Sequence, residues 1–563
     1  MTDRSSSRRA TSSGRARDVE GARTGRSLSD AVRAEPDDGR LDGGERQQVL
    51  DTLIAVLGGA YAHLPAKRAA YAVDPVHELE LLRRRSSDLT EAEFHLAVTG
   101  IVTRLRDAHT RYIGPSRLRE QVAALPFLVE QYGPFDAPRY VVTKTAGVVA
   151  GDEAFKAGVR LDWWNGIPFD RAVELYADRE TGGRADARRA RALESLTFRA
   201  LDYGPPPDEH WVVVGYRTRR GGQHEVKVPW QVYVPGKAAT AAKPGSRAQA
   251  KQAADPAAEA VRRAKKRLFA PTLWLSEDED ARQLTASARV PLRTPIPTSF
   301  QDTLSAQRLT ASLGYLRIWS FDVDDDDAFL DEVTRLLGLL PQDRLIVDLR
   351  GNPGGLVWAA ERLLQLFVDH PPGQAIAPTR FQLVASPLTR EMASNPFNRL
   401  ELQAWAASLE DAVSTGEQYA QPLPLTDPSW CNDRARVYPG RAVAVVDANT
   451  YSSGDLFSAG WVDNAVGPLV CVGRATGAGG ANVWTSNQLR DALTGTDHQF
   501  ATLPAGVGFT IAIRRAIRSG LSDGIPIEDL GISGIPYDMT ENDVLSGNKD
   551  LYAFCANVID QSG

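Results

Sequence analysis

Hydrophobic positions recur with a helical period in the front part of the chain. From Glu45 to about Pro115, apolar residues repeat every three or four positions in RQQVLDTLIAVLGGAYAHL and LTEAEFHLAVTGIVTRLRD. That spacing places them on one face of a helix. We therefore predict a helical region over residues 46–120, with one helix ending at Asp107, directly before Ala108-His109-Thr110.

Residues 124–233 change to short apolar runs that are typical of strands, such as RYVVTKTAG and HWVVVGYRT. Within FKAGVRLDWWNGIPFDRAVELYA, a strand and a tight Asn165-Gly166 turn lead into a helix. This order resembles the core of a PDZ domain. We predict a PDZ-like α+β module here, and an unrelated α+β insert is the alternative.

From about Thr298 to the end, predicted strands and helices alternate. The strands DRLIVDLR and RAVAVVD are each followed by a helical pattern, LVWAAERLLQLFV and SGDLFSAGWVD. Alternation of this kind favours an α/β fold with a mostly parallel sheet. The acidic run Asp322 to Asp327 is interpreted as favourable charge at a helix N-terminus rather than as a metal site.

Two segments lack the apolar residues that a core needs. Residues 1–45 are polar, poor in aromatic residues and without a period, so we predict disorder. Residues 234–295 contain the Ala/Lys/Arg-rich stretch 237–268, which predicts a solvated helix or a mobile linker. Such a linker is also a plausible site of self-processing.

Composition and charge exclude several classes of protein. The 563 residues carry a net charge of −6, which argues against a nucleic-acid partner. No apolar run reaches the roughly 18 residues of a membrane span, and no secretory signal or lipidation motif is visible, so we expect a cytoplasmic protein without a membrane partner. Cys431, Cys471 and Cys555 form no metal motif and are expected to be buried thiols.

Two strand–turn–helix junctions offer chemistry. At the first, the strand LIVDLR runs into the turn GNPGG at 351–355, whose glycines let backbone N–H groups point into a cleft. At the second, the turn 448–453 leads into a helix and contains Ser452 and Ser453. A hydroxyl at a helix start is usually an N-cap. It can also be a nucleophile, because the helix N-terminus and the next N–H stabilise developing negative charge.

The motif DLRGNPGG at 348–355 resembles the signature of the tail-specific, or C-terminal processing, serine peptidases and their tricorn-like relatives. TYSSGD at 450–455, VGRATGAGG at 472–480 and IEDLGI at 527–532 follow in the order of that family. The resemblance covers residues 296–563, and more weakly the helix before His109. It implies a crotonase/ClpP-like peptidase domain, with the nucleophile at Ser452, three residues before the helix-opening Asp455.

The resemblance also indicates what activates the serine. The bacterial processing enzymes use a lysine in the Thr-Gly-rich turn, but residues 475–480 contain none, and none lies between Lys266 and the polar-tail Lys549. The tricorn-like branch uses histidine and glutamate in the order His, Ser, Glu, which implies His109 and Glu528. An imidazole suits proton transfer near neutral pH, and a carboxylate on its other nitrogen fixes the tautomer.

Alternatives remain for each role. His498 is the main rival to His109 as the base, and Asp529 is the alternative to Glu528 as the carboxylate. The oxyanion donors are assigned to the N–H of Ser453 and to Gly354 or Gly355, which the sequence does not separate.

We therefore predict a serine endopeptidase that cleaves protein or peptide substrates through a Ser452 acyl-enzyme, without a metal or an organic cofactor. A catalytically inactive binding or scaffold protein on the same fold is one alternative, since fold alone does not determine function. A crotonase-type acyl-CoA enzyme is the other. Substrate preference and oligomeric state are beyond what the sequence determines.

Overall fold

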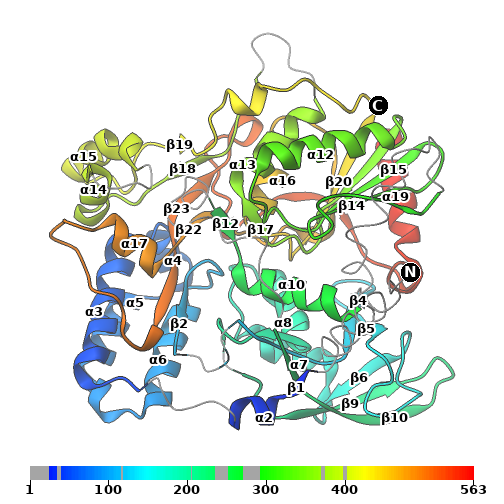
Figure 1. Ribbon diagram of the computed structural model, residues 1–563, viewed down its shortest axis with the longest axis horizontal. Helices are drawn as coiled ribbons and strands as arrows, with labels where there is room; N and C mark the ends of the chain where they lie inside the picture. Colours follow the sequence, from blue (N-terminus) through cyan, green and yellow to red (C-terminus); the bar gives the residue numbers. More distant parts are fainter. Residues whose placement is uncertain are drawn as a thin grey trace, which may run out of the picture.

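The structure is a computed structural model that describes residues 25–33, 40–115, 118, 120–204, 206–234, 252–269, 292–368, 375–396 and 402–562. In the view of Figure 1, an α/β domain forms the upper part. The N-terminal helices and a β-rich module lie below it, on the left and on the right.

The N-terminal region is helical, with α3 (Gly43–Gly59), α4 (Leu64–Tyr71), α5 (Pro75–Arg85) and α6 (Glu91–Thr103). The last of these ends at Thr103, before the predicted end at Asp107. Local capping explains where two of them begin. The Asp42 carboxylate accepts the N–H of Glu45 at 2.8 Å, and the Thr90 hydroxyl accepts the N–H of Glu93 at 3.3 Å. After α6 the chain passes His109 and enters the short strand β2 (Arg111–Ile113).

The β-rich module contains two sheets. One has the strand order β10-β9-β6-β5-β4, with β7 beside β6. Its strands are β4 (Phe127–Tyr132), β5 (Arg139–Thr145), β6 (Arg160–Trp164), β7 (Ile167–Pro168), β9 (Trp211–Arg217) and β10 (Gln223–Pro229). The expected Asn165-Gly166 turn joins β6 to β7, with φ angles of 47° and 83°, before α7 (Phe169–Ala177). The helix α8 (Ala185–Ser195) packs beside α7.

The second sheet of the module has the order β1-β11-β3-β8, formed by β1 (Arg26–Ser27), β11 (Gln231–Tyr233), β3 (Val122–Ala124) and β8 (Phe198–Ala200). Here the structure differs from the disorder predicted for residues 1–45. The described residues 25–33 form β1 and α2 (Leu28–Arg33), because Leu28 and Ala31 are buried in the core of the module.

The Ala/Lys/Arg-rich stretch, predicted as a solvated helix or a mobile linker, is mainly a helix in its described part, but its apolar face is buried. Residues 252–254 form β12 and residues Pro256–Phe269 form α10. Val261, Ala264 and Leu268 of α10 pack on the β3 and β8 side of the module. The apolar side chains of this stretch are few, but their spacing of three and four residues places them on one helix face, which is sufficient for docking. In Figure 1, α10 lies between the module and the α/β domain.

The α/β domain is built on a sheet with the order β13-β14-β15-β16-β20-β21-β24. The strands are β13 (Pro295–Ile296), β14 (Leu304–Arg308), β15 (Leu313–Ile318), β16 (Arg344–Asp348), β20 (Arg441–Asp447), β21 (Leu469–Ala475) and β24 (Ser533–Tyr537). β15, β16, β20 and β21 are parallel, as the alternation of strands and helices predicted.

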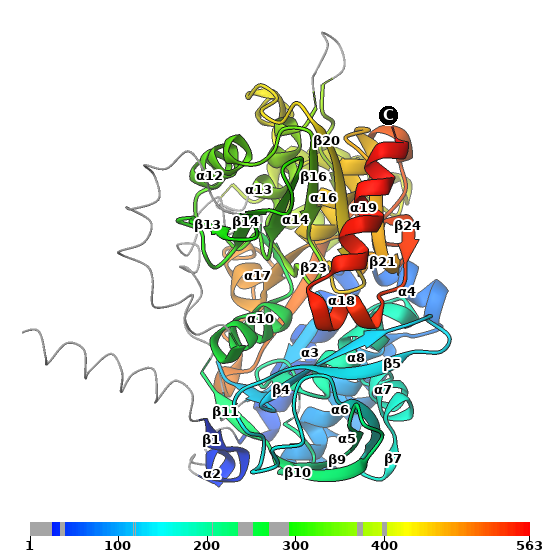
Figure 2. The same cartoon turned by 90° about the vertical axis from the view of Figure 1, so that its right-hand side faces the viewer.

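Helices cover both faces of this sheet (Figure 2). Leu345 and Val347 pack in the core that includes α12 (Asp326–Leu339), α13 (Val357–Arg362) and α16 (Ser453–Asp463), whereas Ile346 packs toward α19 (Lys549–Gln561). The acidic run does begin a helix, since Asp325 accepts the N–H of Ala328 at 3.0 Å. Cys431, Cys471 and Cys555 are buried free thiols, as predicted.

A further sheet connects the N-terminal region to the α/β domain. Its order is β19-β18-β23-β2, with β22 beside β23. The strands are β18 (Arg380–Gln382), β19 (Leu423–Pro424), β22 (Ala481–Thr485) and β23 (Gly508–Ile517) in addition to β2. The remaining helices are α14 (Pro387–Ser394), α15 (Ala406–Thr415), α17 (Ser486–Ala492) and α18 (Glu541–Ser546). Because β2 pairs with β23, the residues just before β2 are carried into the α/β domain.

Within the described ranges, no individual helix has both the length and the apolar composition to cross a membrane. The pair α3 and α4, bent by 90° between its members, passes the same test when taken together.

Candidate active site

The two junctions singled out in the sequence lie next to each other. β16 and β20 are parallel neighbours, with Asp348 opposite Val445. The carboxyl ends of parallel strands meet at the same edge of a sheet, so the glycine turn after β16 and the serine turn after β20 share that edge. A direct contact joins them, since the N–H of Tyr451 donates to the backbone oxygen of Asn352 at 2.8 Å.

Ser452 lies on a strained turn between β20 and α16. Its φ angle is 62°, which non-glycine residues seldom adopt. The buried Asp455 holds the turn by accepting the N–H groups of Ser452 at 2.8 Å and of Gly479 at 2.9 Å. Burial raises the pKa of Asp455 to about 6, against the effect of these hydrogen bonds. The serine hydroxyl is thus presented at the N-terminus of a helix.

His109 lies against this hydroxyl. Its Nε2 is 2.9 Å from Oγ of Ser452, and both residues are 0% exposed. Asp107 positions the histidine by accepting its backbone N–H at 2.8 Å. Burial lowers the pKa of His109 to about 4, although Asp107 and Asp255 oppose this shift. At neutral pH the ring is therefore uncharged and able to accept a proton from Ser452.

The glycine turn packs tightly beside the serine. The hydroxyl of Ser453 donates to the backbone oxygen of Gly355 at 2.9 Å. Gly355 has a φ of 142°, and a Cβ built on it would lie 2.0 Å from the carbonyl carbon of Phe321. The N–H of Gly354 donates to Oδ1 of Asn352 at 2.9 Å. The two glycines, which the sequence did not separate, therefore differ in what their N–H groups contact.

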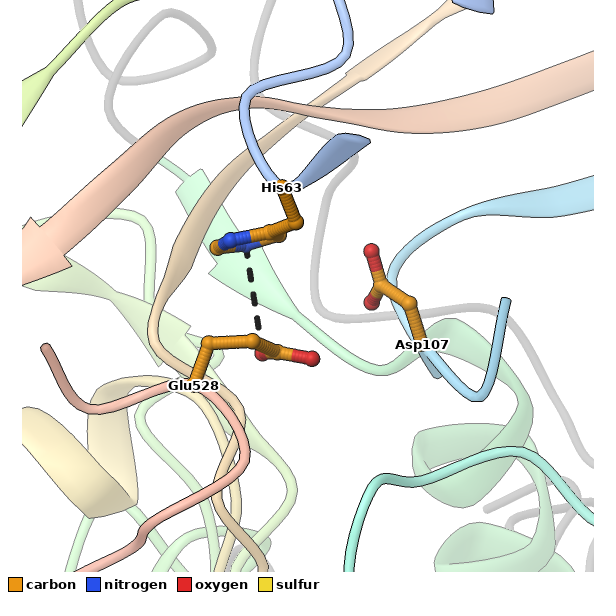
Figure 3. Close-up of side chains that lie close together, drawn as sticks. All are labelled: His63, Asp107 and Glu528. Carbon is orange, nitrogen blue, oxygen red and sulfur yellow. Dashed lines mark ion pairs between the residues drawn. The ribbon is translucent and has the colours of Figure 1, made fainter. Parts of the chain in front are cut away.

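Glu528 reaches the same region, but its hydrogen bond goes to another residue. Oε1 of Glu528 accepts from Nζ of Lys67 at 2.7 Å, while Oε2 lies 3.9 Å from Nε2 of His63. Figure 3 shows the His63 ring facing the Glu528 carboxylate, with Asp107 beside them. Among the residues that the structure describes, Oε2 of Glu528 and Nδ1 of His109 are both buried and have no hydrogen-bond partner.

The alternative carboxylate, Asp529, also binds Lys67, at 2.6 Å, and it accepts from the Tyr71 hydroxyl at 3.0 Å. The alternative base lies elsewhere. His498 pairs with Glu391, and its side chain is 44% exposed. Lys549 is exposed at the start of α19.

The site is enclosed by the segment that the sequence analysis interpreted as a linker. β12 pairs with the strand β17 (Gly354–Leu356), antiparallel, with Ala253 opposite Gly355. Asp255, next to β12, is buried and binds Arg191 at 2.6 Å and Arg111 at 3.4 Å. The guanidinium of Arg191 in turn lies 4.5 Å from the centre of the Tyr451 ring. A charged layer from α8, β2 and the start of α10 thus borders the site.

Sequence reasoning missed Lys67, His63, Asp255 and Arg191 as neighbours of the site. His63 and Lys67 are four residues apart, a spacing that places both on one side of α4, but a four-residue spacing of two polar residues is common. Asp255 and Arg191 lie in segments with no motif, and only the packing of α10 and α8 brings them here.

Comparison with known families agrees with this geometry. Residues 312–518 match the model of peptidase family S41. The matched segment contains both the glycine turn and the serine turn. The chain is a serine-type peptidase, a hydrolase that acts on proteins or peptides. No match was found among curated proteins.

Solved structures align with the chain to different extents. Mature CPAF aligns with a TM-score of 0.63 and 17% identity, over 92% of this chain and 98% of that one. Mature CPAF complexed with lactacystin aligns with a TM-score of 0.59 and 16% identity, over 92% and 99%. The photosystem II D1 C-terminal processing protease aligns with a TM-score of 0.37 and 15% identity, over 88% and 94%. The mixed α/β fold is thus shared with CPAF across the described chain.

Proposed function

We propose that this peptidase is an endopeptidase that cleaves peptide bonds through an acyl-enzyme on Ser452, with His109 as the general base. The observation that carries the proposal is the 2.9 Å contact between Nε2 of His109 and Oγ of Ser452. A neutral imidazole at hydrogen-bond distance from a hydroxyl at a helix N-terminus is the arrangement that makes a serine nucleophilic.

The reaction follows from these two groups. His109 takes the proton from Oγ of Ser452 as the oxygen attacks the carbonyl carbon of the peptide bond. The resulting tetrahedral oxyanion collapses when the C–N bond breaks, and His109 gives its proton to the leaving amine. A water molecule, deprotonated by His109, then hydrolyses the ester and restores the serine hydroxyl.

For the oxyanion we propose the N–H of Ser453 and the N–H of Gly355. Ser453 follows the nucleophile at the start of α16, where the N-terminal end of the helix dipole favours negative charge. Both glycines have a neighbour at this position, since the Gly354 N–H donates to Oδ1 of Asn352 and Gly355 lies opposite Ala253 in the pairing of β17 with β12. Gly355 is also in contact with the Ser453 hydroxyl through its carbonyl oxygen, which places it next to the nucleophile.

For the carboxylate that supports His109 we propose Glu528. Asp107 is closer to the histidine in the chain, but both of its oxygens already have donors: the N–H of His109 on Oδ1, and the hydroxyls of Tyr61 and Thr110 on Oδ2. Oε2 of Glu528 is buried and has no donor among the described residues. Nδ1 of His109 and Nε2 of His63, which lies 3.9 Å from Oε2, are likewise buried without a hydrogen-bond partner there. Because buried polar atoms are normally hydrogen-bonded, the unpartnered Oε2 favours Glu528 as the carboxylate that accepts from Nδ1 of His109.

Two finer assignments of the fold belong to the proposal. The alternation of parallel strands and helices from β15 to β21 supports a crotonase-like peptidase domain. The order β6, Asn165-Gly166 turn, β7 and α7 supports a PDZ-like module, which would bind substrate by strand addition.

A fluorophosphonate probe tests the proposal. The wild type should be labelled, and Ser452→Ala should fold but remain unlabelled and inactive, because the attacking oxygen is absent. Ser453→Ala, which keeps its backbone N–H, should still be labelled, and this distinguishes the two hydroxyls. Labelling of Ser452→Ala equal to wild type would contradict the assignment. An unlabelled, inactive wild type would favour the scaffold alternative, and turnover of acyl-CoA thioesters alone would favour the crotonase alternative.

A further inference from the structure

A buried ammonium lies within the charged cluster next to the proposed base. The side chain of Lys67 is 0% exposed. Its Nζ contacts Oε1 of Glu528 at 2.7 Å, Oδ1 of Asp529 at 2.6 Å and the backbone oxygen of Arg106 at 3.4 Å. An ammonium has three protons to donate, so these acceptors account for all of them.

The same cluster contains a set of donor atoms that a metal ion could use. Donor atoms of His63, Asp107 and Glu528 lie within 4.8 Å of one another (Figure 3). However, the Asp107 oxygens already accept from a backbone N–H and two hydroxyls, and Oε1 of Glu528 accepts from Lys67. The cluster therefore has a cation of its own, and a divalent ion would have to compete with a covalently attached ammonium next to it.

We propose that Lys67 is a positioning residue of the peptidase: its ammonium binds the carboxylate of Glu528 and holds it in place for its proposed role with His109, and thereby determines the lowest pH at which the enzyme works. The inference rests on the proposed function. It does not make Lys67 a base, because its two carboxylate partners raise the pKa of the ammonium and keep it protonated.

The electrostatic argument concerns all the groups that face Glu528. Burial raises the pKa of Glu528 well above its usual range, Asp107 and Asp529 raise it further, and Lys67 opposes this shift. The other titratable neighbours are His63, Tyr61 and Tyr451. His63 cannot replace the lysine charge near neutral pH, because burial lowers the pKa of its ring to about 3. Lys67 is therefore the cation that offsets this group of carboxylates.

The sign of the effect follows. A carboxylate that loses an adjacent cation binds a proton at higher pH, typically by about one to three pH units. In Lys67→Met the acidic limb of kcat/KM should therefore move to higher pH by that amount, so that activity at pH 6 falls at least about tenfold relative to activity at pH 8. Lys67→Arg keeps the charge and should restore most of the wild-type profile.

The experiment is a pH profile of kcat/KM on a peptide substrate for wild type, Lys67→Met and Lys67→Arg. Lys549→Met, at an exposed lysine, is the matched control and should follow the wild type. The proposal is overturned if Lys67→Met is active and the acidic limb of its pH profile is unchanged. It is also overturned if the acidic limb of Lys67→Arg moves to higher pH as far as that of Lys67→Met. It is also overturned if a chelator abolishes wild-type activity and a divalent ion restores it, since an ion would then be the cation of the cluster.

A second comparison covers the case in which Lys67→Met does not fold. Glu528→Gln is compared with the double variant Lys67→Met/Glu528→Gln, in which the charge of Glu528 is removed together with that of the lysine. If Lys67 acts through Glu528, the two profiles should coincide, whereas a further displacement in the double variant overturns the proposal. Failure of the proposed function is recognised separately, because the wild type itself would then show no turnover and no labelling.

Discussion

At the scale of single residues, the site combines an unusual backbone angle at Ser452 with buried histidines whose pKa values are lowered. Ser452 has a positive φ, and Asp455 compensates for it with hydrogen bonds from the N–H groups of Ser452 and Gly479. His109 and His63 are both buried, and burial lowers their pKa values to about 4 and about 3. There is therefore a pH range in which each ring is neutral in the folded protein but protonated in the unfolded chain.

These two histidines make folding sensitive to acid. In the unfolded chain both rings take up a proton below about pH 6.5, whereas the folded protein resists this until about pH 4 for His109 and about pH 3 for His63. Their contribution to stability is thus complete above about pH 6.5 and is lost progressively as the pH falls toward these values. We expect Tm to drop more between pH 7 and pH 5 for the wild type than for His63→Gln/His109→Gln. An equal fall in Tm for the two proteins, measured by thermal unfolding at pH 7 and pH 5, would contradict the pKa assignments.

At the scale of elements, two parallel strands and the turns after them build the reactive edge. β16 leads into the glycine turn and β20 leads into the serine turn, and both turns use backbone geometry that few residues tolerate. The glycine at 355 is the extreme case, because it combines a positive φ with a backbone contact from Phe321 that leaves no room for a Cβ.

Gly355→Ala should therefore displace the turn. The added methyl would meet Phe321 backbone atoms 2.0 to 2.2 Å away, so the proposed oxyanion donor must move. We expect a loss of about a hundredfold or more in kcat, of the order seen when an oxyanion donor is removed. Gly351→Ala is the matched control, since it also has a positive φ but would have no heavy atom within 4 Å of its new Cβ. Similar losses in kcat in both variants would show that strain, and not the donor, is responsible.

At the scale of the whole molecule, the proposed base and the nucleophile come from different parts of the chain. The connection is the pairing of β2 with β23, reinforced where the Ala512 N–H donates to the Thr110 hydroxyl at 3.1 Å and the Ala62 N–H donates to the Ala512 oxygen at 2.9 Å. The Thr110 hydroxyl also donates to Oδ2 of Asp107 at 2.8 Å. One buried side chain thus links β23 to the loop that holds His109.

Thr110→Val tests this connection. Valine keeps the shape but leaves the Ala512 N–H without its acceptor and Asp107 without one donor, which should cost about 1 to 3 kcal/mol of stability. We expect kcat to fall at least about tenfold, because a small displacement of His109 weakens its contact with Ser452. Thermal unfolding and peptide hydrolysis measure the two effects. A variant that is less stable but fully active would show that this bond does not position the histidine.

Much of the α/β domain could be predicted from the sequence. The alternation of strands and helices, the glycine turn at 351–355 and the serine turn before Asp455 are local patterns, and the structure contains the elements they predict. The predicted disorder of residues 25–33 and the predicted solvation of residues 252–269 differ from the structure for one reason. Both are short amphipathic segments whose few apolar residues are buried only against another part of the chain.

The sequence by itself therefore determined the alternation of strands and helices in the α/β domain, its parallel sheet and the glycine and serine turns, because hydrophobic period, glycine and helix-start signals act over a few residues. The choice of Ser452 within the serine turn came from the resemblance to the processing peptidases. Only the tertiary structure decided which groups meet around His109. Lys67, Asp107, Asp255 and Glu528 are separated by up to 461 positions, and their partners follow from how β2, α4 and α10 dock. Charge pairing inside a protein depends on distance and burial, which no local pattern specifies.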